Sequence, residues 1–217
     1  MNRFLTRFTL VVALATLSAA AIACDSSTPT VSKVFQAAPW QANEDYTYNL
    51  LDQGNKVIGT CQLKTTPNSA PGESLLEQLC SNTAGDRDDR AVKVDAQTLR
   101  PLQGTRTIFA IKKNSTTVTE STYSDSKVSL KINEAGDIHN AVRALPTPSK
   151  DNPDPGYYDD ESLFWIVRGI PFADGYSGAY QDINASNGQS FVAKLSIVDK
   201  GTLKVPAGTF EAWKIRL

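Results

Sequence analysis

The feature of this sequence that most constrains its fold is a two-residue alternation of apolar and polar side chains. It is clearest over Lys127–Asn133, where Val128, Leu130 and Ile132 alternate with lysine and serine. Successive side chains of a β-strand point to opposite faces, so such a segment has one face on a core and one in water. Similar segments follow one another, separated by turn-forming residues. We predict strands over residues 44–51, 56–65, 74–80, 90–96, 104–112, 115–123, 127–133, 189–199, 204–205 and 209–217.

One segment departs from this alternation. Acids at Asp159–Glu161 precede an apolar block, and Arg168 and Gly169 follow it, which are start and stop signals of a helix. We predict a short helix over residues 160–168, with a buried strand of the same length as the alternative. Residues 133–159 are rich in proline and aspartate and are expected to form a long excursion. The predicted fold is mainly β: an antiparallel meander curled into a barrel or half-barrel, with one short covering helix.

The N-terminal segment has the layout of an export signal. Arg3 and Arg7 precede an uncharged, mostly apolar run over residues 8–23, which ends in small residues directly before Cys24. The run is shorter than the roughly 20 residues of a transmembrane helix. The site resembles the bacterial lipobox, in which the cysteine carries a diacylglyceryl group, although Ala21 stands where leucine is usual. The alternative is plain secretion with an incidental cysteine.

These signals divide the chain into three parts. We expect a lipoprotein signal peptide over residues 1–23, a flexible tether over 24–38 and a single β domain over 39–217. Because Leu217 stops within an apparent strand, the domain is expected to be truncated at its C-terminal end. Removing the signal leaves 20 basic and 23 acidic residues, so no basic surface for nucleic acid is expected. Attachment to the membrane would come from the lipid on Cys24, at the extracytoplasmic face of the cell envelope.

The two remaining cysteines predict a disulfide. An even pair of cysteines in an exported protein is typical of a structural bridge. In a hairpin folded between Ala70 and Pro71, Cys61 and Cys80 stand directly opposite each other. Opposed Cβ atoms lie about 4.5–5.5 Å apart, close to the separation that a disulfide tolerates. The alternative is two buried free thiols.

The sequence offers little catalytic machinery. Its single histidine, His139, falls in the excursion without a Gly-x-Ser-x-Gly elbow or zinc-ligand spacing around it. Five acids lie near the predicted helix, but their order does not follow a calcium-binding loop, and a solvated loop leading to the helix N-terminus explains them. These acids are Asp151, Asp154, Asp159, Asp160 and Glu161. We therefore predict no catalytic residue, no metal site and no cofactor.

The most distinctive motif is Pro206-Ala207-Gly208-Thr209-Phe210, near the C-terminus. With the segments 94–102, 160–163 and 170–172 it resembles an uncharacterised family of bacterial envelope proteins, a domain of unknown function. The resemblance implies a fold similar to the lipoprotein-carrier proteins, an antiparallel sheet curled around an apolar hollow with helical cover. No catalytic residues are attributed to that family. The motif also has a structural explanation, a tight turn followed by residues that favour strands.

Aromatic side chains are the remaining candidates for a binding site. Phe164, Trp165, Phe172 and Trp213 could line an apolar cavity, although aromatic residues more often belong to a solid core. Phe164 and Trp165 cannot both face the sheet, because adjacent helical positions point about 100° apart. The expected function is a membrane-tethered, non-enzymatic lipoprotein that binds a lipid or acyl chain. The alternative is a structural or interaction protein with a solid core and no ligand; an enzyme comes third.

The lipoprotein hypothesis predicts the effect of Cys24→Ser. Without the thiol no thioether can form, so the variant should remain unlipidated and leave the membrane fraction. Membrane fractionation of cells expressing the parent and the variant checks this. A variant that still sediments as an integral lipoprotein would contradict the assignment of Cys24.

Overall fold

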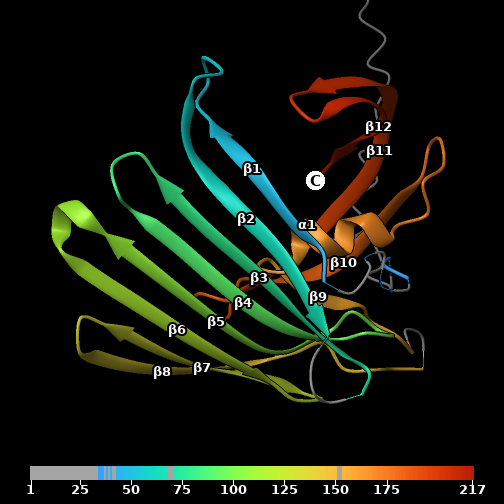
Figure 1. The fold of residues 1–217 in the computed structure, drawn as a ribbon. Helices are drawn as coiled ribbons and strands as arrows, with labels where there is room; N and C mark the ends of the chain where they lie inside the picture. The colour runs from blue at the N-terminus through green and yellow to red at the C-terminus, as the bar shows by residue number, and fades with distance from the viewer. Residues whose placement is uncertain (1–33, 37, 39, 41–42, 68–70, 151–152) are drawn as a thin grey trace, which may run out of the picture.

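A large open sheet dominates the computed structural model, which describes residues 34–36, 38, 40, 43–67, 71–150 and 153–217 (Figure 1). The first sheet contains eight antiparallel strands in sequence order, β1 to β8, and the second contains four, in the order β12-β11-β10-β9. The large sheet curls without closing. The predicted mainly β, antiparallel half-barrel meander with one short helix is therefore confirmed.

The elements follow one another along the chain with short connections in the large sheet. They are β1 (Asp45–Leu51), β2 (Val57–Pro67), β3 (Glu73–Asn82), β4 (Arg87–Asp95), β5 (Pro101–Ala110), η1 (Ile111–Lys113), β6 (Ser115–Tyr123), β7 (Lys127–Glu134), β8 (Asp137–Ala144), β9 (Tyr157–Asp159), α1 (Leu163–Ile166), η2 (Val167–Gly169), β10 (Ser177–Ile183), β11 (Ser190–Val205) and β12 (Gly208–Arg216). Among these described residues, no helix is long and apolar enough to cross a membrane.

The excursion expected over residues 133–159 is wrong in part. Asp137–Ala144 forms strand β8, joined to β7 by a two-residue turn in which Ala135 and Gly136 have φ values of 52° and 105°. Such positive φ angles at both positions are typical of the turns that connect tight hairpins. His139 consequently lies on a strand and not in a loop. Strands β9 and β10 were also not predicted.

The helix prediction is confirmed in kind but not in length. Helix α1 and the 3₁₀ turn η2 together cover Leu163–Gly169, so the rival prediction of a strand is wrong. The acids expected to begin the helix instead belong to the end of β9 and the turn after it. The Pro206-Ala207 pair forms the turn between β11 and β12, as the structural explanation of that motif predicts.

The main core lies where α1 and the small sheet pack against the large one (Figure 1). Phe35 is fully buried there, with edge-to-face contacts to Tyr158 at 4.7 Å and Tyr180 at 5.2 Å between ring centroids. Val34 is also buried. Two residues of the segment expected to be a tether thus pack into the core of the β domain. The predicted signal peptide and Cys24 lie outside the described residues.

The predicted disulfide is present. Cys61 on β2 and Cys80 on β3 are directly paired in the register of the hairpin, with Cα atoms 4.1 Å apart, and their sulfur atoms are bonded. The two residues are 19 positions apart in the sequence. The bridge therefore joins neighbouring strands of one hairpin.

Removal of this bridge should destabilise the domain. In the chain-entropy model a loop of this size contributes about 3 kcal/mol by restricting the unfolded chain. We expect the double variant Cys61→Ala/Cys80→Ala to lose about that free energy of unfolding, measured by urea denaturation. Reductant should lower the stability of the parent and leave the variant unchanged; a parent insensitive to reductant would contradict this.

Candidate functional site

A cavity of about 950 Å³ lies on one face of the large sheet. Strands β1 to β5, the turn η1 and one side chain of α1 line it. Most of its apolar lining comes from strand residues and Phe164, together with the disulfide. The apolar residues are Tyr48, Leu50, Leu63, Ile108, Phe109, Ala110 and Phe164. We call this hollow the sheet pocket.

The strand register explains how the pocket is assembled. Directly opposed residues of antiparallel strands point to the same face. Tyr48, Cys61, Cys80, Asp88 and Ile108 are opposed in turn across β1 to β5 and form one row of the pocket. The disulfide therefore forms part of the pocket wall, between an aromatic residue and a carboxylate.

A second row of residues lies two positions further along the strands, on the same face. It contains Leu63, Gln78, Arg90 and Arg106, again opposed in turn. Gln78 is 5% exposed, and its Oε1 atom has no hydrogen-bond partner among the described residues. Within the pocket lining, the side chains of this row thus change from apolar Leu63 on β2 to polar Gln78 on β3 and charged Arg90 on β4.

The two aromatic residues of α1 separate as helical geometry requires. Trp165 is 4% exposed and belongs to the main core, whereas Phe164 is 62% exposed and lines the sheet pocket. Phe172 and Trp213 pack against each other, with ring centroids 6.3 Å apart, and neither lines this pocket. Of the four aromatic candidates, the structure places only Phe164 in the pocket.

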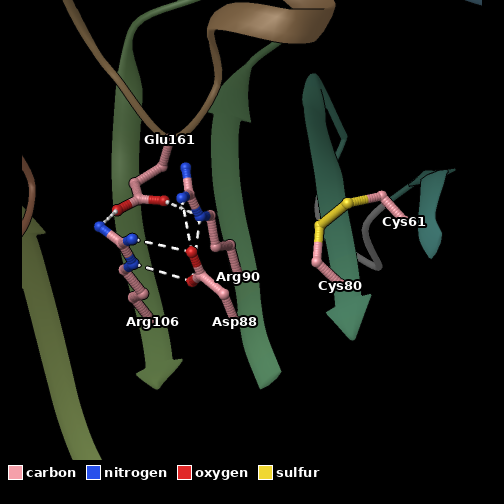
Figure 2. The surroundings of a disulfide bond; sticks show 6 residues. All are labelled: Cys61, Cys80, Asp88, Arg90, Arg106 and Glu161. Carbon is pink, nitrogen blue, oxygen red and sulfur yellow. Dashed lines mark hydrogen bonds and ion pairs between the residues drawn. A yellow bond between two sulfur atoms is a disulfide. The ribbon is translucent and has the colours of Figure 1, made fainter. Parts of the chain in front are cut away.

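A partly buried ionic network borders the pocket, and Figure 2 shows its four side chains together with the disulfide. Asp88 and Arg90 come from β4, Arg106 from β5, and Glu161 reaches them from the turn before α1. Arg90 Nη2 and Arg106 Nη2 lie 2.7 Å and 2.8 Å from Asp88 Oδ2. Arg90 Nε lies 2.9 Å from Glu161 Oε2, and Arg106 Nη1 lies 3.3 Å from Glu161 Oε1. Each carboxylate is thus held by both arginines.

Three carboxyl groups in and around this network are buried. Burial, followed by the neighbouring carboxylates Glu161 and Asp160, raises the pKa of Asp159 to about 8. Burial also raises the pKa of Glu161 to about 7, against the opposing effect of Arg90 and Arg106. Burial and the charge of Asp160 raise the pKa of Asp182 to about 7. For Asp88, by contrast, burial is outweighed by hydrogen bonds from both arginines, which hold its pKa below the ordinary value.

Burial of these acids corrects the prediction of a solvated acidic loop. Asp159 is fully buried, accepts a hydrogen bond from the Tyr123 hydroxyl at 3.0 Å, and accepts another from the Ser162 amide at 3.0 Å. Glu161 is 2% exposed. Asp154 forms an ion pair with Arg100, and Asp151 lies outside the described residues. Solvation therefore does not explain Asp159 and Glu161, which anchor the turn before α1 to the sheets.

Metal binding and histidine chemistry gain no support from this geometry. Across the described part of the chain, no group of three or more histidine, cysteine, aspartate or glutamate side chains is placed to hold a metal ion. His139 is exposed on β8 and is not a lining residue of the sheet pocket. The pocket instead presents apolar side chains next to the charged side chains of β4.

Fold and pocket together define an open, curled β-sheet protein with a surface cavity. The chain belongs to a family described as protein of unknown function DUF3108, whose model matches residues 83–217. No curated protein and no solved structure matches the sequence. The expectation of an uncharacterised domain family is confirmed at this level. The match covers β4 to β12 and all four residues of the ionic network, whereas the disulfide hairpin precedes it.

The buried acids predict how stability depends on pH. A carboxyl whose pKa is raised by folding binds its proton more tightly in the folded state, so stability falls as pH rises between the two values. For Asp159 that window runs from about pH 4 to about pH 8, and for Glu161 and Asp182 it ends at about pH 7, at about 1.4 kcal/mol per pH unit and group. We expect Asp159→Asn, which mimics the neutral acid, to lose less stability than the parent between about pH 5 and pH 8.

Chemical denaturation at the two pH values measures this difference. Asp137→Asn, at an exposed position of the β7–β8 hairpin, is the matched control and should follow the parent. An Asp159→Asn variant with the parent's full pH dependence would show that Asp159 is ionised in the folded protein at about pH 5.

Proposed function

We propose that this protein is an extracytoplasmic lipoprotein, tethered through Cys24, that holds an apolar ligand such as a lipid or acyl chain in the sheet pocket. The observation that carries the proposal is the cavity of about 950 Å³ with a largely apolar and aromatic lining. Cavities that bind small molecules commonly measure about 300–1,000 Å³ and have mostly apolar walls with a few polar groups. The sheet pocket has both properties.

The exposed aromatic side chains of the pocket lining support the proposal that a ligand binds there. Phe164 is 62% exposed and Tyr48 is 51% exposed, although both are large aromatic residues facing a concave surface. Covering apolar surface contributes about 25 cal/mol per Å², so a ligand seated against both rings would gain affinity from their burial. The unpartnered Gln78 Oε1 adds a buried acceptor that a ligand or water could satisfy.

The charged groups beside the pocket favour binding over catalysis. Asp88 and Arg90 face the pocket, but each is engaged in the network with Arg106 and Glu161. In this proposal the network holds α1, and with it Phe164, at a fixed position over the sheet. The open sheet with a helix on one face is also the arrangement implied by the likeness to lipoprotein-carrier proteins, which forms part of the proposal.

Two alanine substitutions should separate the pocket from the core. We expect Phe164→Ala to weaken binding of the neutral fluorophore N-phenyl-1-naphthylamine by roughly 5- to 30-fold, equivalent to about 1–2 kcal/mol. Its thermal stability should change little, because the side chain is mostly exposed. Trp165→Ala should instead lose about 3–5 kcal/mol of stability, because it leaves a hole in the core.

Ile138→Ala is the matched control, since Ile138 is 55% exposed on β8 and lies outside the pocket lining. Native mass spectrometry of the lipoprotein purified from its own membrane should then show a co-purifying lipid. A parent protein that binds no probe and carries no lipid would leave the structural alternative, a scaffold with a solid core.

A further inference from the structure

The rim of the sheet pocket carries positive charge. Lys112 and Lys113 belong to η1, the turn between β5 and β6, and Arg87 begins β4. All three line the pocket, and Phe109 and Phe164 line it with them. The Arg87 guanidinium lies over the ring of Phe109, 5.7 Å from its centroid. Because Arg87 and Phe109 oppose each other one residue along from Asp88 and Ile108, their side chains project from the other face of the strands, and Lys112 and Lys113 are the remaining cations of the rim.

One acid of the pocket, Asp86, lies close enough to Lys112 that the lysine charge contributes to lowering its pKa. Asp86 accepts hydrogen bonds from the Ile111 amide at 2.8 Å and the Asn82 side chain at 3.0 Å, and the Asn82 bond is the main cause of its lowered pKa. Asp88 is held by Arg90 and Arg106. Within the described part of the chain, Arg87, Lys112 and Lys113 form no ion pair within 4.0 Å.

The excess positive charge of the pocket lining therefore lies at the end formed by η1. On the pocket face the three basic residues Arg90, Lys112 and Lys113 exceed the two acids Asp86 and Asp88 by one positive charge. Arg90 is compensated within the ionic network, so the excess lies at the η1 rim. It contrasts with the chain as a whole, which has a net charge of −1. An apolar pocket that ends at two lysines with an excess of positive charge is complementary to a molecule with an apolar chain and an anionic end.

We infer that the ligand of the sheet pocket is an anionic amphiphile. Its apolar chain lies along Tyr48, the disulfide and Ile108, beneath Phe164, and its carboxylate or phosphate lies against Lys112 and Lys113. The inference rests on the proposed function and specifies the chemical class of its ligand. The anionic end supplies orientation and the chain supplies most of the buried area.

The test compares two probes with the same chain, oleate and methyl oleate, on the full-length protein below their aggregation concentrations. Oleate should bind at least roughly tenfold more tightly than its neutral ester, and the difference should shrink in about 0.5 M salt because the rim is exposed to solvent. The double variant Lys112→Gln/Lys113→Gln should bring the affinity for oleate close to that for the ester. The matched control Lys127→Gln/Lys131→Gln, on β7 outside the pocket, should leave both affinities unchanged.

The outcomes separate this inference from the proposed function. If both probes bind equally, or if the rim variant keeps the full preference for oleate, the anionic class is overturned while the apolar pocket stands. If neither probe binds, the proposed function itself fails. Inorganic phosphate should not displace oleate; complete displacement would indicate a site for small anions and overturn the amphiphile.

Discussion

The arrangement of this molecule depends on the insertion of Glu161 between two arginines of the large sheet. The turn that carries Glu161 is joined to the end of the small sheet on one side and to α1 on the other. Its contacts with Arg90 and Arg106 therefore fix the small sheet and the helix relative to β4 and β5. Loss of one partner from such a buried network leaves an uncompensated charge and commonly costs about 3–5 kcal/mol. Glu161 therefore links the position of Phe164 to the large sheet, together with the bond from Tyr123 to Asp159 and the shared core.

Much of the large sheet could be predicted because its strands alternate without interruption. Lys127–Glu134 has its apolar side chains on the buried face, and the predicted strand differs from the observed one by a single residue. Strand β8 escaped prediction because its apolar residues do not face the core: Ile138 and Val142 are 55% and 56% exposed. Strand β10 begins with small residues, and Val34 packs so closely on Gly178 that an added Cβ would lie 2.5 Å from its side chain. The need for glycine at position 178 arises from its contact with Val34, which is distant in the sequence. The residues around β10 therefore show no pattern from which it could be predicted.

Some features of the candidate site could likewise be predicted from the sequence, and others could not. The pairing of Cys61 with Cys80 could be predicted, because both residues lie in one hairpin and the turn sets its register. The burial of Glu161 could not, since its partner Arg106 lies 55 residues away and a run of acids is typical of solvated loops. The alternation also places Leu63 and Ile108 on apolar faces, but it does not indicate which part of a face remains uncovered. A pocket on an open sheet forms where no other part of the chain covers the sheet, and the sequence of one strand does not show where that is.

The sequential pairing of the large sheet has a consequence for how the protein acquires its structure. Each of its strands pairs only with its neighbours in the chain, so the separation between contacting residues stays short for a β protein, and short separations favour rapid folding. A chain emerging from its N-terminal end can therefore extend the sheet one hairpin at a time. Glu161 and the small sheet emerge last, and their contacts span much longer stretches of chain. We expect the open sheet to exist as an intermediate, with its apolar face uncovered until the C-terminal third arrives.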